Sequence, residues 1–252
     1  YPFELLQPSR LTAHLAVEIF ERLSHAAPDA WPCWAYSNHD VMGHRSRWRL
    51  SDKAARLYAT LLVCMRGSIC LYQGEELGLP EADVAYEDLQ DPYGIEFWPE
   101  FKGRDGCRTP IPWEVSNRNA GFSDGKPWLP VAPEHLGLAV AVEDADRNSI
   151  LNHYRKAIAL RTAWPVLCTG AMSVNPAQGD ILGFTRSDED QTLFCAFNLG
   201  EHDAIIHLPP GQWRQIGEDL GTARPHEDGT VMLRGWQACL VSGTPALPGG
   251  AG

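Results

Sequence analysis

Hydrophobic residues recur at helical spacing in two stretches near the start of the chain, and each stretch opens at a residue that commonly caps helices. The first covers residues 12–25 and opens at Thr12. The second covers residues 51–67, opens at Ser51 and is apolar nearly all round, so we expect a well-buried helix. Gly67 is suited to the position just after its C-terminal end.

Two short apolar runs flank the second of these helices and predict strands. They cover residues 33–37 and 68–76, and each ends in a polar cluster. A strand, a helix and a strand of these lengths form a βαβ unit, whose strands pair in parallel. In parallel α/β folds the active site lies at the carboxyl ends of the strands, so we expect the polar clusters to be functional.

The composition and periodicity of the chain change after the second predicted strand. Residues 74–147 are rich in Gly, Pro and aromatic side chains, and a loop of this length usually carries function. Residues 148–164 restore helical spacing. Short strand-like runs then predict an all-β domain, a sandwich or Greek key, so we divide the chain into residues 1–169 and 170–252. We expect residues 244–252 to be disordered.

Composition and charge exclude several partners. The 252 residues are 44% hydrophobic and carry a net charge of −11, so we expect neither a nucleic acid nor a membrane as partner. No apolar run reaches the roughly 20 residues that a membrane-spanning helix needs. The seven cysteines have irregular spacing, which disfavours zinc or a disulfide framework, and we expect a cytoplasmic protein.

The segment "WAYSNHDVMGHRSRW" places Asn38, His39 and Asp40 side by side at the end of an apolar run. Asn and Asp are poor strand formers, and such a cluster more often marks a functional loop than a packed core. From the residues alone, Asp40 could equally cap the following turn, and His39 could be an ordinary surface residue.

Three motifs follow one another in a recognisable order: "YSNHD", "LYQGEELGLP" and "GRDGCRTP". In this order they resemble the C-terminal half of an α-amylase-superfamily glycoside hydrolase (glycoside hydrolase family 13), in its α-glucosidase branch. Residues 151–161 are similar to the last barrel helix of that family. The resemblance implies an α/β fold, namely the C-terminal part of a (β/α)8 TIM barrel followed by an all-β C-terminal domain.

The resemblance also implies that part of the catalytic machinery lies elsewhere. In the family, the nucleophilic aspartate and the acid/base glutamate follow barrel strands four and five, for which this sequence offers no counterpart. Two or three parallel strands cannot close a barrel. The first residue is not methionine. We therefore expect the N-terminal half of the barrel to be a second polypeptide or to be missing.

The same resemblance assigns roles to individual residues. Retaining glycosidases use one carboxylate to attack the anomeric carbon and another to protonate the leaving oxygen. By resemblance, Asp40 is a third, catalytic carboxylate that stabilises the transition state, and His39 binds the same glucose. Arg108 helps to close the glucose pocket and Arg104 lies nearby, although both arginines could instead staple the loop through salt bridges.

Other charged residues of these motifs have a structural interpretation. We expect Asp105 to be structural, and Glu75 and Glu76 to anchor a loop, because neighbours on one strand point to opposite faces. Gly43 stands where the α-glucosidase branch usually has an arginine, and Arg45 is a candidate to replace it.

The long loop is rich in aromatic residues. Aromatic faces stack on pyranose rings, but they also fill the cores of irregular loops, and for each single residue we favour packing. The residues concerned are Tyr86, Tyr93, Phe97, Trp98, Trp113 and Trp128.

Together these observations predict an α-glucosidase-type retaining glycosidase that acts on terminal α-linked glucose of short oligosaccharides. A glucosyl transferase or sucrose isomerase of the same family, and a non-catalytic sugar-binding fragment, are the alternatives. The expected partner is an α-glucoside oligosaccharide or disaccharide substrate. We assign no metal ligand and no cofactor to this chain, although calcium is common in the first barrel half of the family.

Overall fold

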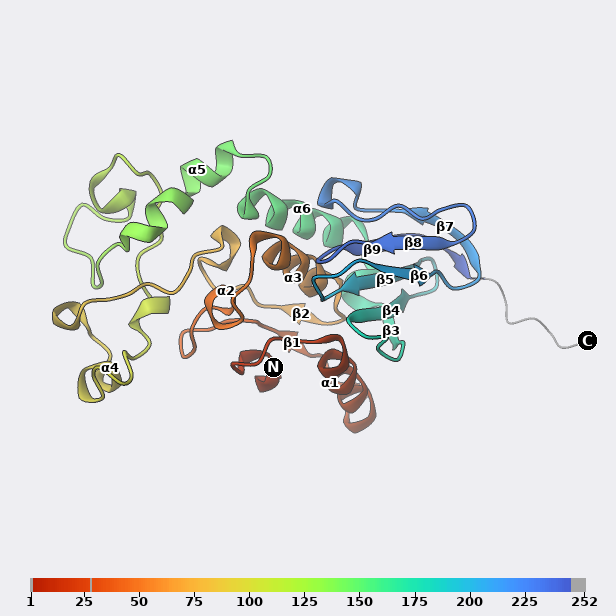
Figure 1. The fold of residues 1–252 in the computed structure, drawn as a ribbon, viewed down its shortest axis with the longest axis horizontal. Coiled ribbons are helices and arrows are strands. Elements are labelled where there is room, and N and C mark those ends of the chain that lie inside the picture. Colours follow the sequence, from red (N-terminus) through yellow and green to blue (C-terminus); the bar gives the residue numbers. More distant parts are fainter. Residues whose placement is uncertain (1, 28, 246–252) are drawn as a thin grey trace, which may run out of the picture.

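The computed structural model describes residues 2–27 and 29–245 (Figure 1). Two short parallel strands lie in the middle of the molecule, antiparallel strands lie at one end, and the segment between residues 78 and 149 extends to the other end. The first residues form a 3-10 turn, η1 (Phe3–Leu6), beside the first strand.

The predicted βαβ unit is present. β1 (Cys33–Trp34) pairs in parallel with β2 (Ser68–Ile69), and α3 (Asp52–Cys64) connects them after the short α2 (His44–Arg47). The side chain of Ser51 accepts a hydrogen bond from the Ala54 amide, which confirms the predicted cap of α3.

The predicted first helix is also confirmed. It is α1 (Ala13–Ala26), and the Thr12 side chain accepts a hydrogen bond from the Leu15 amide at 3.2 Å. α6 (Ile150–Ala163) matches the predicted third helix and is capped in the same way by Ser149. α7 (Val166–Thr169) follows directly.

Two predictions at the ends of these elements are wrong. α3 ends at Cys64 rather than near Gly67, because buried arginine side chains bind its last carbonyl groups and a glycine cap is not needed. Gly67 has φ 113° at the start of β2, where any Cβ would lie 2.3 Å from the Pro32 carbonyl oxygen. Both strands are also shorter than predicted, two residues each.

The chain leaves β2 through a turn rather than as a continued strand. Gly74 has φ 90°, and the 3-10 turn η2 (Glu75–Leu77) follows it. Glu75 and Glu76 are therefore not neighbours on a strand, and the argument from opposite strand faces does not apply to them.

The long aromatic segment contains short helical elements separated by irregular backbone. Their bounds are η3 (Tyr86–Asp88), α4 (Pro92–Glu96), η4 (Asp105–Cys107), η5 (Arg118–Gly121), η6 (Pro133–Leu138) and α5 (Val140–Ala145).

The strands after residue 170 pair antiparallel. One sheet has the order β3-β4-β5-β9-β7, and β6 pairs with β8 in a separate ribbon; a 3-10 turn, η7 (Glu218–Leu220), follows β7. The bounds are β3 (Ala171–Val174), β4 (Ile181–Ser187), β5 (Thr192–Asn198), β6 (Ala204–His207), β7 (Gly211–Gln215), β8 (Thr230–Leu233) and β9 (Ala238–Pro245). β9 thus includes the first two residues of the tail predicted to be disordered, and the rest of that tail lies outside the described residues.

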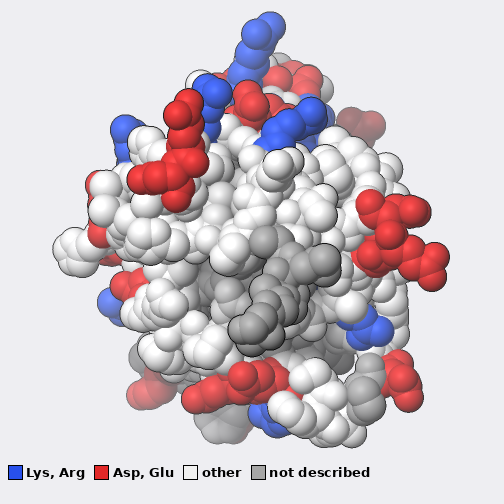
Figure 2. Space-filling view, turned by 90° about the vertical axis from the view of Figure 1, so that its right-hand side faces the viewer, with Lys and Arg blue, Asp and Glu red and all other residues white. Residues whose placement is uncertain are grey.

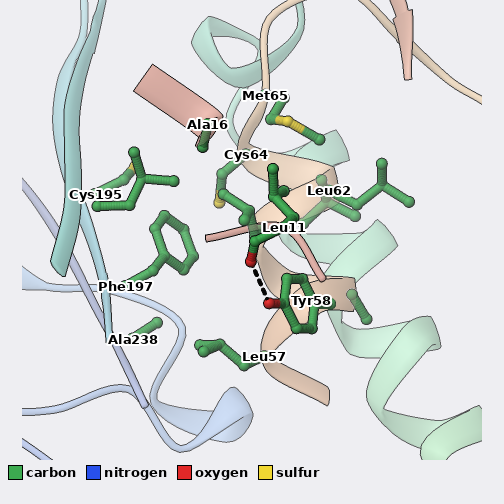
Figure 3. Packing of buried hydrophobic residues seen from close by; sticks show 14 of the residues in the cluster. Leu11, Ala16, Leu57, Tyr58, Leu62, Cys64, Met65, Cys195, Phe197 and Ala238 are labelled. Carbon is green, nitrogen blue, oxygen red and sulfur yellow. Dashed lines mark hydrogen bonds between the residues drawn. The ribbon is translucent and has the colours of Figure 1, made fainter. Parts of the chain in front are cut away.

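One hydrophobic core joins the helices to the antiparallel sheet. Figure 3 shows Leu57 and Cys64 of α3 facing Cys195 and Phe197 of β5. The buried Tyr58 hydroxyl donates a hydrogen bond to the Leu11 carbonyl at 2.6 Å, which ties α3 to the segment before α1. α3 is buried along most of its length, as its sequence predicted.

The distribution of surface charge and the length of the helices complete the description of the fold. Figure 2 shows the end of the molecule that carries the antiparallel strands, with acidic side chains around its edge and most of the basic side chains along the upper edge. Within residues 2–27 and 29–245, no helix has both the length and the apolar character needed to cross a membrane.

Candidate functional site

Asp40 lies in the loop that follows β1, and local hydrogen bonds fix that loop. The Asp40 amide donates to the Asn38 side-chain oxygen at 2.8 Å, as in an Asx turn. Arg47 donates to the Leu5 carbonyl at 2.9 Å and also to the carbonyls of Tyr36 and Met42. The loop is thereby tied to the first residues of the chain, which leaves little freedom to the Asp40 backbone.

The structure brings the four predicted site residues together at the carboxyl end of β1. One Asp40 oxygen lies 3.0 Å from Arg104 Nη1 and 3.7 Å from Arg108 Nη2. The other lies 3.4 Å from His39 Nε2. The Asp40 side chain is 50% exposed, so its oxygens have room to accept further hydrogen bonds from a ligand.

Arg104 is oriented by a buried carboxylate that sequence reasoning missed. Asp91 accepts hydrogen bonds from Nε and Nη2 of Arg104, both at 2.8 Å, and from its backbone amide. The Arg104 guanidinium holds the pKa of Asp91 well below its usual range. The sequence signal at Asp91 is its place before Pro92, which predicts a helix start but not a partner for Arg104.

Asp105 fixes the backbone that carries Asp91. Its side chain is fully buried and accepts hydrogen bonds from the backbone amides of Gln90 and Asp91, at 2.6 and 2.7 Å. A carboxylate with this role fixes the backbone at Asp91 rather than a ligand. Asp105 therefore has the structural environment expected from the sequence.

Arg108 makes contacts that fit both interpretations given from the sequence, stapling of the loop and a place in the site beside Asp40. Its Nε and Nη2 donate to the His39 carbonyl at 2.8 and 2.7 Å, which staples the loop. The same guanidinium also faces Asp40. Arg108 therefore holds the backbone next to Asp40 and adds positive charge beside its carboxylate.

Gly43 stands where an arginine is usual, and Arg45 was the candidate to replace that arginine. The structure shows that Arg45 does not do so, so this expectation was wrong. Its guanidinium binds Asp52 in the first turn of α3 at 2.7 Å and contacts neither Asp40 nor Arg104 among the described residues. The Gly43 amide instead donates to Glu81 at 3.3 Å.

A layer of buried polar groups lies beneath the Asp40 loop. Ser37 is hydrogen-bonded to His44 Nδ1 at 3.0 Å, and His44 Nδ1 lies 3.8 Å from Glu75. Tyr154 of α6 donates to Glu75 at 3.3 Å. Burial raises the pKa of Glu75 to about 8 and lowers the pKa of His44 to about 3, so neither group is charged at pH 7 despite their proximity.

Replacing Glu75 with glutamine is expected to stabilise the protein at pH 8 but not at pH 5. The raised pKa means that the folded state keeps a proton that the unfolded chain releases above its ordinary pKa of about 4.3. The stability contributed by this proton is therefore lost as the pH rises toward 8, by roughly 3 kcal/mol between pH 5 and 8. Glu75→Gln removes that dependence, which urea unfolding at both pH values measures.

Glu96→Gln, at an exposed glutamate, is the matched control for that comparison. If wild type and Glu75→Gln change equally in unfolding free energy between pH 5 and 8, Glu75 is not a buried proton carrier.

No metal centre is evident in the part of the chain that the structure describes. In those residues no group of three or more His, Cys, Asp or Glu side chains is arranged to hold a metal ion. The cavity of about 30 Å³ behind the site is lined by Ser37, His44, Glu75, Glu81 and Cys107, among others, and has room for about one or two water molecules.

Comparisons with known proteins agree with the motifs. The family profile described as "Alpha amylase, catalytic domain" matches residues 9–170. A probable α-glucosidase of Rhizobium meliloti is 47% identical over 94% of this chain and 44% of its own length. An oligo-1,6-glucosidase of Heyndrickxia coagulans is 30% identical over 92% of this chain and 46% of its own. The chain thus spans less than half the length of these two relatives.

A solved structure is similar over almost the whole chain. The α-glucosyl transfer enzyme XgtA superposes with a TM-score of 0.88 and 44% identity, over 97% of this chain and 46% of the other.

Proposed function

Because the chain belongs to the α-amylase family, glycoside hydrolase family 13, we propose that it carries part of the active site of an α-glucosidase-type retaining glycosidase. The proposed substrate is an α-glucoside oligosaccharide or disaccharide, from which the enzyme removes terminal α-linked glucose. The observation that supports this most is the half-exposed Asp40 carboxylate between Arg104, Arg108 and His39 at the end of a parallel strand.

The proposed role of Asp40 is selective binding of the transition state. Its free acceptor positions suit ring hydroxyl groups of glucose, and these hydrogen bonds strengthen when the ring distorts toward the oxocarbenium ion. Arg104 and Arg108 hold the Asp40 carboxylate in place, so no reorganisation is needed when charge develops. His39 Nε2 lies beside the same carboxylate and is proposed to bind the same sugar.

We propose that the nucleophile and the acid/base carboxylate come from a part of the enzyme outside these 252 residues. The parallel pair β1 and β2 would be two adjacent strands of an eight-stranded barrel, and the antiparallel region after residue 170 would be its C-terminal domain. The remaining strands would belong to a second polypeptide or to another part of the same enzyme. Calcium, where present, would bind in that other part, and the seven free cysteines support a cytoplasmic location.

The anomeric form of the first glucose released tests the proposed reaction. A retaining mechanism releases α-glucose, which proton NMR distinguishes from the β anomer within the first minutes of hydrolysis. We expect the α anomer from maltose or isomaltose with the assembled enzyme. Initial release of β-glucose, or no hydrolysis of any α-glucoside, would contradict the proposal.

Transfer of glucose to another sugar is a second candidate function. It is favoured by the 44% identity to a solved α-glucosyl transfer enzyme. The same covalent intermediate serves both reactions, and the outcome depends on whether water or an acceptor hydroxyl attacks it. The ratio of transfer product to free glucose at increasing acceptor concentration measures which reaction dominates.

A further inference from the structure

Two aromatic rings, one in α4 and one directly after it, form an exposed stack on the segment that carries Arg104. Tyr93 and Phe97 are one helical turn apart, their ring centroids lie 6.4 Å apart, and their planes differ by 10°. The two residues are 56% and 52% exposed. Packing within the described residues, the interpretation favoured from the sequence, leaves about half of each ring uncovered.

Trp98, on the same segment, shows the contrast. It is only partly exposed and packs against the small hydrophobic cluster that contains Leu89 and Leu129. Its ring also contacts Tyr86 at 5.5 Å and the Lys102 ammonium group at 5.4 Å. Tyr86, Trp113 and Trp128 are also about half exposed. Among the described residues, Tyr93 is the only aromatic residue of the loop whose ring lies against an arginine of the candidate site.

The exposed pair is joined to the candidate site through one guanidinium group. Arg104 lies 5.4 Å from the centre of the Tyr93 ring, and its Nη1 lies 3.0 Å from Asp40. Because Asp91 holds this guanidinium in a bidentate hydrogen bond, the spacing between the ring and Asp40 is fixed. The Tyr93 ring is therefore separated from Asp40 by one guanidinium group.

We propose that Tyr93 and Phe97 bind the pyranose ring on the leaving-group side of the scissile bond. This rests on the proposed function, and it assigns these residues a role in substrate specificity and, for a transfer reaction, in acceptor binding. The C–H groups on one face of a pyranose carry slight positive charge and pack against the negative face of an aromatic ring. Arg104 beside the Tyr93 ring offers donors to the hydroxyl groups at the edge of the same sugar.

Comparison of substrates with and without a leaving-group ring tests this proposal. Tyr93→Ala and Phe97→Ala are assayed in the assembled enzyme with maltose, isomaltose, p-nitrophenyl α-glucoside and α-glucosyl fluoride. We expect kcat/KM for the disaccharides to fall about tenfold, as for loss of one stacked ring, and kcat/KM for the fluoride to stay unchanged, since fluoride has no ring to bind. Tyr93→Phe keeps the ring and should retain wild-type kinetics. Trp128→Ala removes a ring that is 61% exposed elsewhere on the loop and is the matched control.

Each other outcome overturns the proposal. An equal loss on the disaccharides and on the fluoride would mean that the rings only hold Arg104 in position. No loss on any substrate would mean that the pair binds no substrate ring, and a loss confined to p-nitrophenyl α-glucoside would point to aromatic aglycones rather than sugars. If wild type hydrolyses none of the four substrates, the proposed function fails, which these kinetics separate from failure of the aromatic site alone.

Discussion

Replacing Asp40 with asparagine is expected to lower kcat about a thousandfold in the assembled enzyme while leaving its folding intact. Asparagine keeps the shape of the side chain but removes the charge that Arg104 and Arg108 face at 3.0 and 3.7 Å. A neutral amide binds developing positive charge weakly and places N–H donors where the carboxylate accepted hydrogen bonds. Loss of one preorganised electrostatic contact to a transition state typically costs a factor of 10² to 10³ in kcat, or about 3–4 kcal/mol.

The measurement is kcat and KM on p-nitrophenyl α-glucoside, together with the melting temperature. The melting temperature should change little, because an ion pair of a half-exposed aspartate contributes only about 0–1 kcal/mol to stability. Asp52→Asn is the matched control, since Asp52 is similarly exposed and also pairs with an arginine, Arg45, at 2.7 Å. Near-normal turnover of Asp40→Asn would exclude the assigned role.

Local chemistry allowed much of the fold to be predicted from the sequence. Thr12 and Ser51 precede periodic apolar runs, and each caps the helix that follows. The parallel pairing followed from two short apolar runs on either side of a buried helix. These features depend on neighbouring residues along the chain, which is the information that a single sequence carries.

Features that depend on distant contacts could not be predicted. The pairing of Arg104 with Asp91 requires α4 to fold back beside the Asp40 loop. The residues next to Asp91 and Arg104 in the sequence do not predict that arrangement. The direction of Arg45 depends on where the first turn of α3 places Asp52. The burial of Glu75 depends on Tyr154 of α6, 79 residues further along the chain. In each case an ionisable residue is placed beside its partner by tertiary packing, which local sequence patterns do not encode.

Arg186 of β4 lies at the junction between the helices and the antiparallel sheet. Its side chain is fully buried. It donates to the carbonyls of Cys64, Leu167 and Gly170 at 2.7, 2.6 and 2.8 Å, and to that of Ala171 at 3.3 Å. It thus links the last turn of α3 to the chain that enters the sheet, and its charge lies where the α3 dipole favours a cation.

Replacing Arg186 with alanine is expected to lower the free energy of unfolding by about 3–5 kcal/mol, because buried carbonyl oxygens lose their donor and a cavity forms. Arg186→Lys should lower the free energy of unfolding by a smaller amount. A single ammonium group cannot reach all the carbonyl groups that the guanidinium group binds. Burial lowers the pKa of Arg186 only to about 10, so the guanidinium is charged at pH 7 and the loss should be the same at pH 6 and pH 8. Guanidinium chloride unfolding measures it, with Arg214→Ala, at an exposed arginine of the same sheet, as control. A change below about 1 kcal/mol for Arg186→Ala would mean that water replaces the guanidinium, and that the junction is held by hydrophobic packing alone.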